Sequence, residues 1–251
     1  MRILRAHTPN PTTNDFFESV LRLEPRVAAF DCDGTLWSGD AGERFFDWET
    51  NNGVVSAEVG QAMRARYAAY KAGKVSEDDM CGEMVTMHKG LSDAFMMQAA
   101  SEFMAGPFES YIFPDMHELV GRLHENGCEV WAVSSSNEWV IRVGLKQFGI
   151  AENRILAAKA ELKDGIVTDR LMRVPSGAGK PQALREVAGK DADAAFGNSR
   201  WDLEMLAEAE HPFAINPNPD LEAAARERGW TIYFPDGTRS RSPITQSPAL
   251  R

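Results

Sequence analysis

The stretch VAAFDCDGTLWSGD, residues 27–40, begins as an apolar run and then carries two aspartates, Asp31 and Asp33, separated by one residue. A short continuous apolar run is typical of a strand that is buried on both faces of a parallel sheet. Residues i and i+2 of an extended chain point to the same side, so both carboxylates face one place although like charges repel. The stretch therefore predicts a buried strand followed directly by two carboxylates that face the same side of the chain.

Two structural explanations of this acidic pair have to be weighed. One is an Asx-type turn that ends the strand. The other is a calcium loop, but the EF-hand pattern needs Gly at its sixth position and Glu at its twelfth. Counted from Asp31, those positions hold Leu36 and Gly42, which excludes the calcium loop. The turn remains open unless other parts of the chain supply partners for the two acids.

The composition is that of an ordinary globular protein. The 251 residues are 43% hydrophobic and 25% charged, which fits one large domain or one domain with a smaller insert. The net charge is −10 and no run of Lys or Arg occurs, so we expect no nucleic-acid partner. Three cysteines without a C-x-x-C pair favour free thiols in a reducing cytosol. No apolar segment suits a signal peptide or a membrane span, so we predict a cytoplasmic protein without a membrane partner.

The rest of the chain alternates short apolar runs with helical segments. Strands are expected at residues 128–133, 193–197, 212–216 and 230–234, with helices at 137–149, 180–189, 201–210 and 220–229. This alternation predicts a Rossmann-like α/β core, in which helices cover both faces of a parallel sheet. The pair Asp164–Gly165, between two β-leaning runs, predicts a hairpin within residues 161–174.

A long helical region interrupts this pattern early in the chain. Helical composition and spacing extend from about residue 43 to residue 106, with glycines as punctuation. We therefore predict an α-helical cap over residues 42–112, inserted into a core formed by residues 1–41 and 113–251. The Pro-, Ser- and Arg-rich tail, residues 235–251, is expected to be loosely held.

Polar residues follow three further predicted strands or loops. Ser134 comes directly after one strand, Lys180 opens a helix after a glycine-containing loop, and Asn198 and Asp202 follow a third apolar run. Ligands of parallel sheets bind at the carboxyl ends of the strands. Each residue also has an ordinary explanation: Ser134 as a helix N-cap, Lys180 as a solvated lysine, and Asp202 as an acid in a first helical turn.

Two well-known catalytic motifs can be excluded at these positions. A phosphate-binding P-loop ending at Lys180 would need Gly at position 174 and Ser or Thr at position 181, where the chain has Val174 and Pro181. A serine hydrolase would need G-x-S-x-G around Ser134, where the sequence reads AVSSSN.

Taken in chain order, D-x-D-G-T, the serine, the lysine and G-N-x-x-x-D resemble the four motifs of the haloacid dehalogenase superfamily. The resemblance covers residues from about 26 to 216. The helical insert lies where this superfamily carries its type 1 cap, and the layout is similar to that of the phosphoserine-phosphatase-like members. The resemblance implies phosphoryl transfer through an aspartyl-phosphate intermediate.

The resemblance also implies a role for each motif residue. Asp31 is the expected nucleophile and Asp33 the expected general acid and base, while Ser134, the amide of Ser135, and Lys180 are expected to bind the phosphate. Mg²⁺ is the expected cofactor, held by Asp31, the main-chain carbonyl of Asp33, and the two residues of the last motif, Asn198 and Asp202. Asn198 stands where the superfamily often has Asp, so the metal is expected to bind more weakly.

Three functions fit this set of residues. The first is a Mg²⁺-dependent phosphatase that acts on a small-molecule phosphomonoester. The second is a phosphomutase or phosphotransferase that uses the same intermediate, and the third is a non-catalytic phosphate-binding protein. The oligomeric state stays open.

The residues in and next to the insert are expected to contact the leaving group of the substrate, so their types indicate what that group is. By an approximate alignment, Gly82 takes the place of the cap arginine that pairs with the substrate carboxylate in phosphoserine phosphatases, and Asp40 matches the acid that holds the substrate amine. Acids and aromatics surround Asp40, namely Trp37, Glu43, Phe45, Phe46, Asp47, Trp48 and Glu49. The simpler explanation is a helix that packs its aromatics into the cap core with its acids in water. The other is a cationic head group without a carboxylate, as in phosphocholine or phosphoethanolamine.

Overall fold

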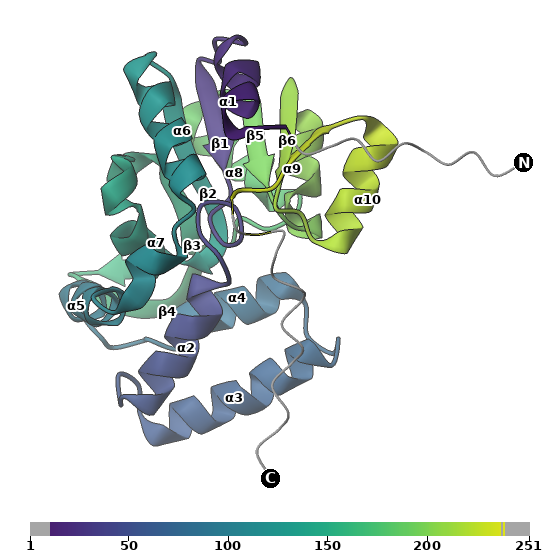
Figure 1. Cartoon of the computed structure of the whole chain (residues 1–251). Helices are drawn as coiled ribbons and strands as arrows, with labels where there is room; N and C mark the ends of the chain where they lie inside the picture. Colours follow the sequence, from purple (N-terminus) through teal and green to yellow (C-terminus); the bar gives the residue numbers. More distant parts are fainter. Residues whose placement is uncertain (1–10, 237, 239–251) are drawn as a thin grey trace, which may run out of the picture.

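The computed structural model describes residues 11–236 and 238, which fold around one seven-stranded sheet (Figure 1). The strand order is β4-β3-β2-β1-β5-β6-β7. Every neighbouring pair is parallel except β3 and β4, which are antiparallel. The strands are β1 (Val27–Phe30), β2 (Glu129–Asn137), β3 (Ile155–Lys163), β4 (Ile166–Arg173), β5 (Ala194–Gly197), β6 (His211–Ile215) and β7 (Thr231–Tyr233). The predicted α/β class is confirmed.

Helices cover both faces of this sheet, as the alternation along β1 requires. Ala28 and Phe30 pack into one core, whereas Val27 and Ala29 pack into the other. The first core includes residues of α1 (Thr13–Leu21), α6 (Pro114–Glu125) and α7 (Glu138–Leu145). The second includes residues of α8 (Gly179–Ala188), α9 (Leu203–Glu208) and α10 (Pro219–Arg228). Short 3₁₀ turns at Lys146–Phe148, Glu152–Arg154 and Arg200–Asp202 complete the connections.

The central position of β1 determines where a ligand can bind. The chain pairs β1 with β2 on one side and with β5 on the other, so the connections leave the sheet in opposite directions. In open α/β sheets this arrangement opens a crevice at the carboxyl ends of the strands. Asp31 is the first residue after β1, and its backbone N–H donates to the Phe196 carbonyl of β5 at 2.9 Å.

Four helices stand between β1 and β2 in the sequence, where the helical insert was predicted. They are α2 (Ala41–Asn51), α3 (Ala57–Lys71), α4 (Glu77–Thr86) and α5 (Asp93–Met104), followed by a 3₁₀ turn at Pro107–Tyr111. Each α-helix begins after an N-cap residue whose side-chain oxygen accepts a backbone N–H of the first helical turn; these N-caps are Asp40, Ser56, Ser76 and Ser92 respectively. These polar residues explain why the helical region divides into separate helices.

The insert is attached to the sheet through the β3–β4 hairpin. The hairpin turns at Asp164 and Gly165, both with positive φ (52° and 77°), as the Asp-Gly pair predicts. The backbone N–H of Asp93 donates to the Gly165 carbonyl at 2.8 Å, and Val167 exchanges backbone hydrogen bonds with the loop before α5. In Figure 1, α2, α3 and α4 lie beyond the carboxyl ends of the strands, and α5 lies beside α7 and the hairpin.

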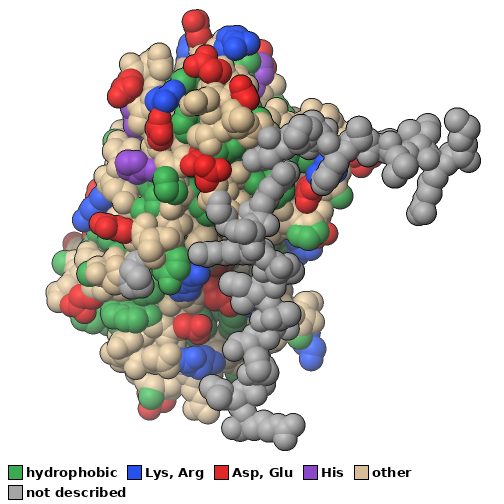
Figure 2. Space-filling model, viewed as in Figure 1, with side chains coloured by type: hydrophobic (Ala, Val, Ile, Leu, Met, Phe, Trp, Pro, Cys, Tyr) green, Lys and Arg blue, Asp and Glu red, His purple; other side chains and the backbone are tan. Residues whose placement is uncertain are grey.

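The sequence-based boundaries differ from the structure in two places. The strand predicted at 128–133 continues to Asn137 and carries the three serines with it, and the first half of β3 pairs in parallel with β2, which was not predicted. Most of the predicted tail lies outside the described residues. Among the described helices, none is long and apolar enough to cross a membrane. On the face in Figure 2, Lys and Arg side chains are interspersed with Asp and Glu.

A buried hydrogen bond joins Glu49 of α2 to His88, which follows α4. His88 Nε2 lies 2.8 Å from Glu49 Oε2, and both side chains are buried. His88 Nδ1 lies 3.0 Å from the Val85 carbonyl, which can only accept, so Nδ1 carries a proton. The contact between Nε2 and Glu49 then needs one further proton, held by either partner. Burial raises the pKa of Glu49, which favours keeping that proton.

We predict that Glu49→Ala destabilises the protein by about 3 kcal/mol, because removing one partner leaves the other buried without its hydrogen bond. Glu49→Gln should lose much less, since the glutamine amide can donate to a neutral His88 Nε2. Urea denaturation at neutral pH gives both unfolding free energies. A Gln variant as unstable as the Ala variant would contradict this account of the pair.

Candidate active site

A cavity of about 490 Å³ lies at the carboxyl ends of the central strands and collects most of the predicted site residues. Its walls come from the ends of β1 and β2, the start of α8, the loop after β5, and the insert. The predicted residues that line it are Asp31, Asp33, Asp40, Ser134, Ser135, Lys180 and Asn198. Asp202 lies behind this wall with no exposed surface. Side chains from four distant parts of the sequence therefore meet at one place.

A buried ammonium group connects three of these parts. Lys180 Nζ donates to Asp31 Oδ1 at 2.7 Å and to Asp202 Oδ1 at 2.5 Å, and it also donates to the Val133 carbonyl at 3.0 Å. Burial by itself would lower the pKa of Lys180, but the Asp202 and Asp31 carboxylates outweigh it and hold that pKa above its ordinary value. Lys180 is therefore a permanent cation and not a solvated surface lysine.

Asp31 is held on both of its carboxylate oxygens. Oδ1 accepts from Lys180, and Oδ2 accepts from Thr35 Oγ1 at 2.9 Å. Burial and the charge of Asp202 raise the pKa of Asp31 to about 6, although Lys180 acts in the opposite direction. At neutral pH Asp31 is a fixed, largely desolvated carboxylate, which is what a nucleophile in this position requires.

Asp33 is fixed by three donors. Oδ1 accepts from Trp37 Nε1 at 2.7 Å and from the backbone N–H of Ala41, the first residue of α2, at 2.6 Å. Oδ2 accepts from Ser136 Oγ at 2.7 Å. Burial and the charge of Asp40 raise the pKa of Asp33 to about 7, against the effect of the Ala41 and Ser136 hydrogen bonds. A carboxyl group that titrates near neutral pH can both give and take a proton.

The serines at the end of β2 do not cap the next helix. Asn137 is the N-cap of α7, and its Oδ1 accepts from the Val140 amide at 3.1 Å. Ser134 is buried and its Oγ accepts from the Ser136 amide at 3.1 Å. The helix-cap explanation of Ser134 is therefore wrong, and both Ser134 and Ser135 line the cavity.

Asp202 shapes the loop after β5. Its Oδ2 accepts from the backbone amides of Asn198 and Ser199, both at 2.9 Å, while Oδ1 accepts from Lys180. A Cβ at Gly197 would lie 2.5 Å from the Asp202 Cβ, so only glycine fits there. Both carboxylate oxygens are thus engaged by the chain, and Asp202 fixes the position of Asn198.

Three oxygen donors at this end of the sheet could hold a divalent cation of low ligand charge. Among the described residues, no three Asp, Glu, His or Cys side chains converge as a metal site. A cation here would depend on Asp31, the Asp33 carbonyl and the Asn198 amide, which are the oxygen donors that Mg²⁺ prefers. The Asn198 amide lies against the chain after Asp33, since a Cβ at Gly34 would come within 1.9 Å of its Nδ2.

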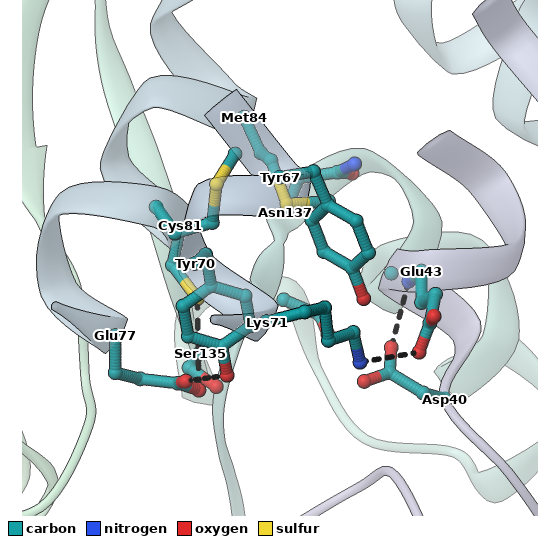
Figure 3. A pocket seen from close by; sticks show the side chains of 13 residues that line it. Asp40, Glu43, Tyr67, Tyr70, Lys71, Glu77, Cys81, Met84, Ser135 and Asn137 are labelled. Carbon is teal, nitrogen blue, oxygen red and sulfur yellow. Dashed lines mark hydrogen bonds and ion pairs between the residues drawn. The ribbon is translucent and has the colours of Figure 1, made fainter. Parts of the chain in front are cut away.

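The aromatics predicted around the leaving group pack elsewhere. Trp37, Phe45 and Phe46 are buried, and Trp48 stacks on Phe45. The packing explanation is correct for these side chains: α2 carries Phe45, Phe46 and Trp48 into the protein, and Trp37 is buried in the turn before α2. Tyr67 and Tyr70 of α3 line the smaller cavity next to Asp40 (Figure 3), and Tyr70 and Trp201 line the larger one.

The structure also places Asp40 and Gly82, the two residues that were aligned with the substrate-binding residues of phosphoserine phosphatases. Asp40 is the N-cap of α2, with Oδ1 accepting from the Glu43 amide at 2.7 Å, and it lines the cavity. Gly82 is buried in α4, where a Cβ would lie 2.7 Å from Leu171 Cδ2 of β4. A side chain at position 82 would therefore have to displace the exposed Leu171 of the hairpin, and the glycine itself offers no group that could pair with a carboxylate.

Several residues at the site were not predicted. Ser136 and Thr35 hold the two aspartates, and both follow from the extended backbone and the D-x-D-G-T turn once these are placed in space. Tyr67, Tyr70 and Lys71 come from α3, whose sequence carries no distinct signal for a site.

The comparisons with known proteins agree with this geometry. Residues 28–207 match the family of haloacid dehalogenase-like hydrolases. Histidinol-phosphatase from Neisseria meningitidis is 27% identical over 217 residues, covering 82% of this chain and 97% of that protein. A phosphoserine phosphatase from Mycobacterium tuberculosis is 26% identical over 216 residues, covering 82% of this chain and 70% of that protein.

A solved structure shares the fold. The crystal structure of a Bordetella pertussis protein of unknown function superposes with a TM-score of 0.73 at 23% identity, covering 83% of this chain and 97% of that one. The family match spans well over half of the chain and contains all four motifs. The chain therefore belongs to the haloacid dehalogenase-like hydrolase family, and it is a phosphoric monoester hydrolase.

Proposed function

We propose that this protein is a Mg²⁺-dependent phosphatase that hydrolyses a small-molecule phosphomonoester through an aspartyl-phosphate on Asp31. The observation that carries the proposal is the pairing of two differently held acids in one cavity. Asp31 is fixed as a carboxylate by Lys180 and Thr35, whereas Asp33 has a pKa of about 7. Two acids with separate tasks are what nucleophilic phosphoryl transfer needs.

In the first step a carboxylate oxygen of Asp31 attacks phosphorus and the bond from phosphorus to the ester oxygen breaks. Asp33 donates its proton to the departing oxygen, so the leaving group departs as a neutral alcohol. Lys180 offsets negative charge on Asp31 and on the phosphoryl group. Ser134 and the Ser135 amide, which line the cavity, bind the phosphoryl oxygens.

In the second step water hydrolyses the acyl phosphate. Asp33, now ionised, takes a proton from the water as its oxygen attacks phosphorus, and the bond from phosphorus to Asp31 breaks. Inorganic phosphate leaves, and both acids return to their starting states. Asp31, the Asp33 carbonyl and Asn198 would hold Mg²⁺, with Asp202 keeping the Asn198 loop in place. When bound, the metal neutralises charge between the carboxylates and the phosphate.

The leaving group is proposed to carry an amine. Three further carboxylates, those of Asp40 at the start of the insert and of Glu43 and Glu77 within it, line the same cavity as Asp31. The Neisseria relative is named for histidinol phosphate, an amine-bearing ester without a carboxylate. A phosphomutase or phosphotransferase would share the first step and differ in the acceptor, and a binding protein would release no phosphate. The names of both curated relatives favour hydrolysis.

We predict that Asp31→Asn lowers the rate of phosphate release by at least about 1,000-fold, because the amide cannot replace a covalent nucleophile. The test is phosphate release from a panel of phosphomonoesters with Mg²⁺ present. Asp47→Asn, on the exposed side of α2, is the matched control and should keep normal rates. Retained turnover in Asp31→Asn would refute the mechanism, and phosphate retained on an isomerised product would identify a mutase.

Metal removal supplies a second test. Phosphate release should stop in EDTA and return when Mg²⁺ is added. Asn198→Asp should lower the Mg²⁺ concentration needed for half-maximal activity, since it adds a negative charge to the ligand set. Full activity in chelator would argue against a metal, and an unchanged Mg²⁺ requirement in both Asn198→Asp and Asn198→Ala would remove Asn198 from its site.

The pH profile tests the role of Asp33. As the general acid, Asp33 must be protonated, so kcat/KM should fall as pH rises through its pKa of about 7. Ser136 donates to the charged form, so Ser136→Ala should raise that pKa and move the alkaline limb to higher pH. Ser199→Ala, in the loop after β5, should leave the limb in place. A limb that moves down in Ser136→Ala contradicts the assignment.

A further inference from the structure

A second, smaller cavity of about 70 Å³ opens beside the first, between the insert and the end of β2 (Figure 3). Its walls come from α2, α3, α4 and the residues Ser135 to Asn137. Six residues line both cavities, namely Asp40, Glu43, Tyr70, Glu77, Ser135 and Ser136. An ester whose phosphate lies at Asp31 therefore has its leaving group next to this smaller cavity.

The smaller cavity surrounds an ammonium group of the protein itself. Lys71 Nζ lies 3.5 Å from Glu43 Oε2. The same nitrogen lies 5.0 Å from the ring centre of Tyr67 and 5.9 Å from that of Tyr70. Within the described part of the chain, Lys71 is the only cationic side chain among its lining residues, against the carboxylates of Asp40, Glu43 and Glu77. Carboxylates and aromatic faces are the surroundings in which ammonium groups bind.

Lys71 is held loosely in this position. Its side chain is 54% exposed and its ion pair with Glu43 is long, so the interaction is weak and screened by solvent. Helix α3, which carries Lys71, has Gly60 as its only buried residue. Neither the ion pair nor core packing prevents the Lys71 ammonium from moving aside.

We propose that Asp40, Glu43 and Tyr67 form the subsite for a substrate ammonium group, which Lys71 occupies until the substrate displaces it. This inference rests on the proposed phosphatase function and specifies its leaving group. Figure 3 shows the Tyr67 hydroxyl directed towards Glu43 and the Lys71 nitrogen beside Asp40 and Glu43. A substrate carboxylate is disfavoured here because three acids line the cavity.

The far side of the smaller cavity identifies the rest of the leaving group. Met80, Cys81 and Met84 of α4 line it together with the ring of Tyr67. Methionine sulfur and aromatic carbon make favourable contacts with flat rings. The substrate class is therefore an amino alcohol phosphate that also carries an aromatic or heteroaromatic ring, with the ammonium near the ester and the ring against α4.

Four synthetic esters separate these features. They are 2-amino-3-phenylpropyl phosphate, 3-phenylpropyl phosphate, phosphoethanolamine and phosphoserine. We expect kcat/KM for the first to exceed that of each of the others by at least about tenfold. Glu43→Gln should reduce the advantage over 3-phenylpropyl phosphate, the ester without an amine. Tyr67→Ala should reduce the advantage over phosphoethanolamine, the ester without a ring.

The variant Lys71→Met tests directly whether the Lys71 ammonium occupies the subsite of the substrate ammonium. Removing the internal competitor should lower KM for 2-amino-3-phenylpropyl phosphate several-fold, with kcat little changed and with no gain for 3-phenylpropyl phosphate. Lys74→Met is the matched control, because Lys74 is exposed and lines neither of the two cavities. Its kinetics should equal those of the wild type.

Two results would overturn the inference. One is phosphoserine as the best substrate with a selective loss in Lys71→Met, since Lys71 would then bind a carboxylate. The other is equal kcat/KM for the esters with and without an amine. In either case, hydrolysis that still depends on Asp31 leaves the proposed phosphatase function standing. Absence of phosphate release from every ester would instead refute that function.

Discussion

The site depends on one buried ammonium group that serves two carboxylates. Lys180 lies between Asp31 and Asp202, and removing the lysine would leave two buried carboxylates close together without their shared counter-charge. Because Lys180 begins α8 and Asp202 begins α9, the ammonium also determines how these two helices meet the end of β1. The same ion pairs therefore hold the Asp31 carboxylate and position α8 and α9 at the carboxyl ends of the strands.

Asp202 illustrates how that interaction reaches the proposed metal site. One of its oxygens accepts from Lys180 and the other accepts from the amides of Asn198 and Ser199. Asn198 is thus positioned through its backbone, and its side-chain amide is left to face the cavity. A neutral ligand at this place suits a site in which Lys180 already supplies positive charge beside Asp31.

Much of the core could be predicted from the sequence because its signals are local. The apolar runs before Asp31 and Ser134 mark strands, and the Asp164–Gly165 pair specifies its own turn. The four motifs meet because parallel strands end at one edge. The assignment of roles to these residues remains a prediction, as do the boundaries of the insert as a separate domain.

The leaving-group pocket could not be predicted in the same way. Trp37 and Phe45 are near Asp40 in the sequence, but the turn into α2 directs them into the core. Tyr67 and Lys71 reach the pocket from a helix that begins 17 residues after Asp40, and their arrival depends on how α3 crosses α2 and α4. Nearness to Asp40 in the sequence therefore does not predict which side chains line the pocket, because the direction of each helix decides which of its side chains face the core.

The attachment of the insert has a consequence for how the pocket opens. Backbone hydrogen bonds join the region around α5 to the β3–β4 hairpin, and the first amide of α2 is bound to Asp33. Because both ends of the insert are held by these hydrogen bonds, a rigid movement of the whole insert would break the bond from Ala41 to Asp33, the proposed general acid. Helix α3 has Gly60 as its only fully buried residue. A displacement of α3 would disturb less of the core than a movement of the whole insert, so we expect the cavity to open on the side of α3 while the end of the sheet stays in place.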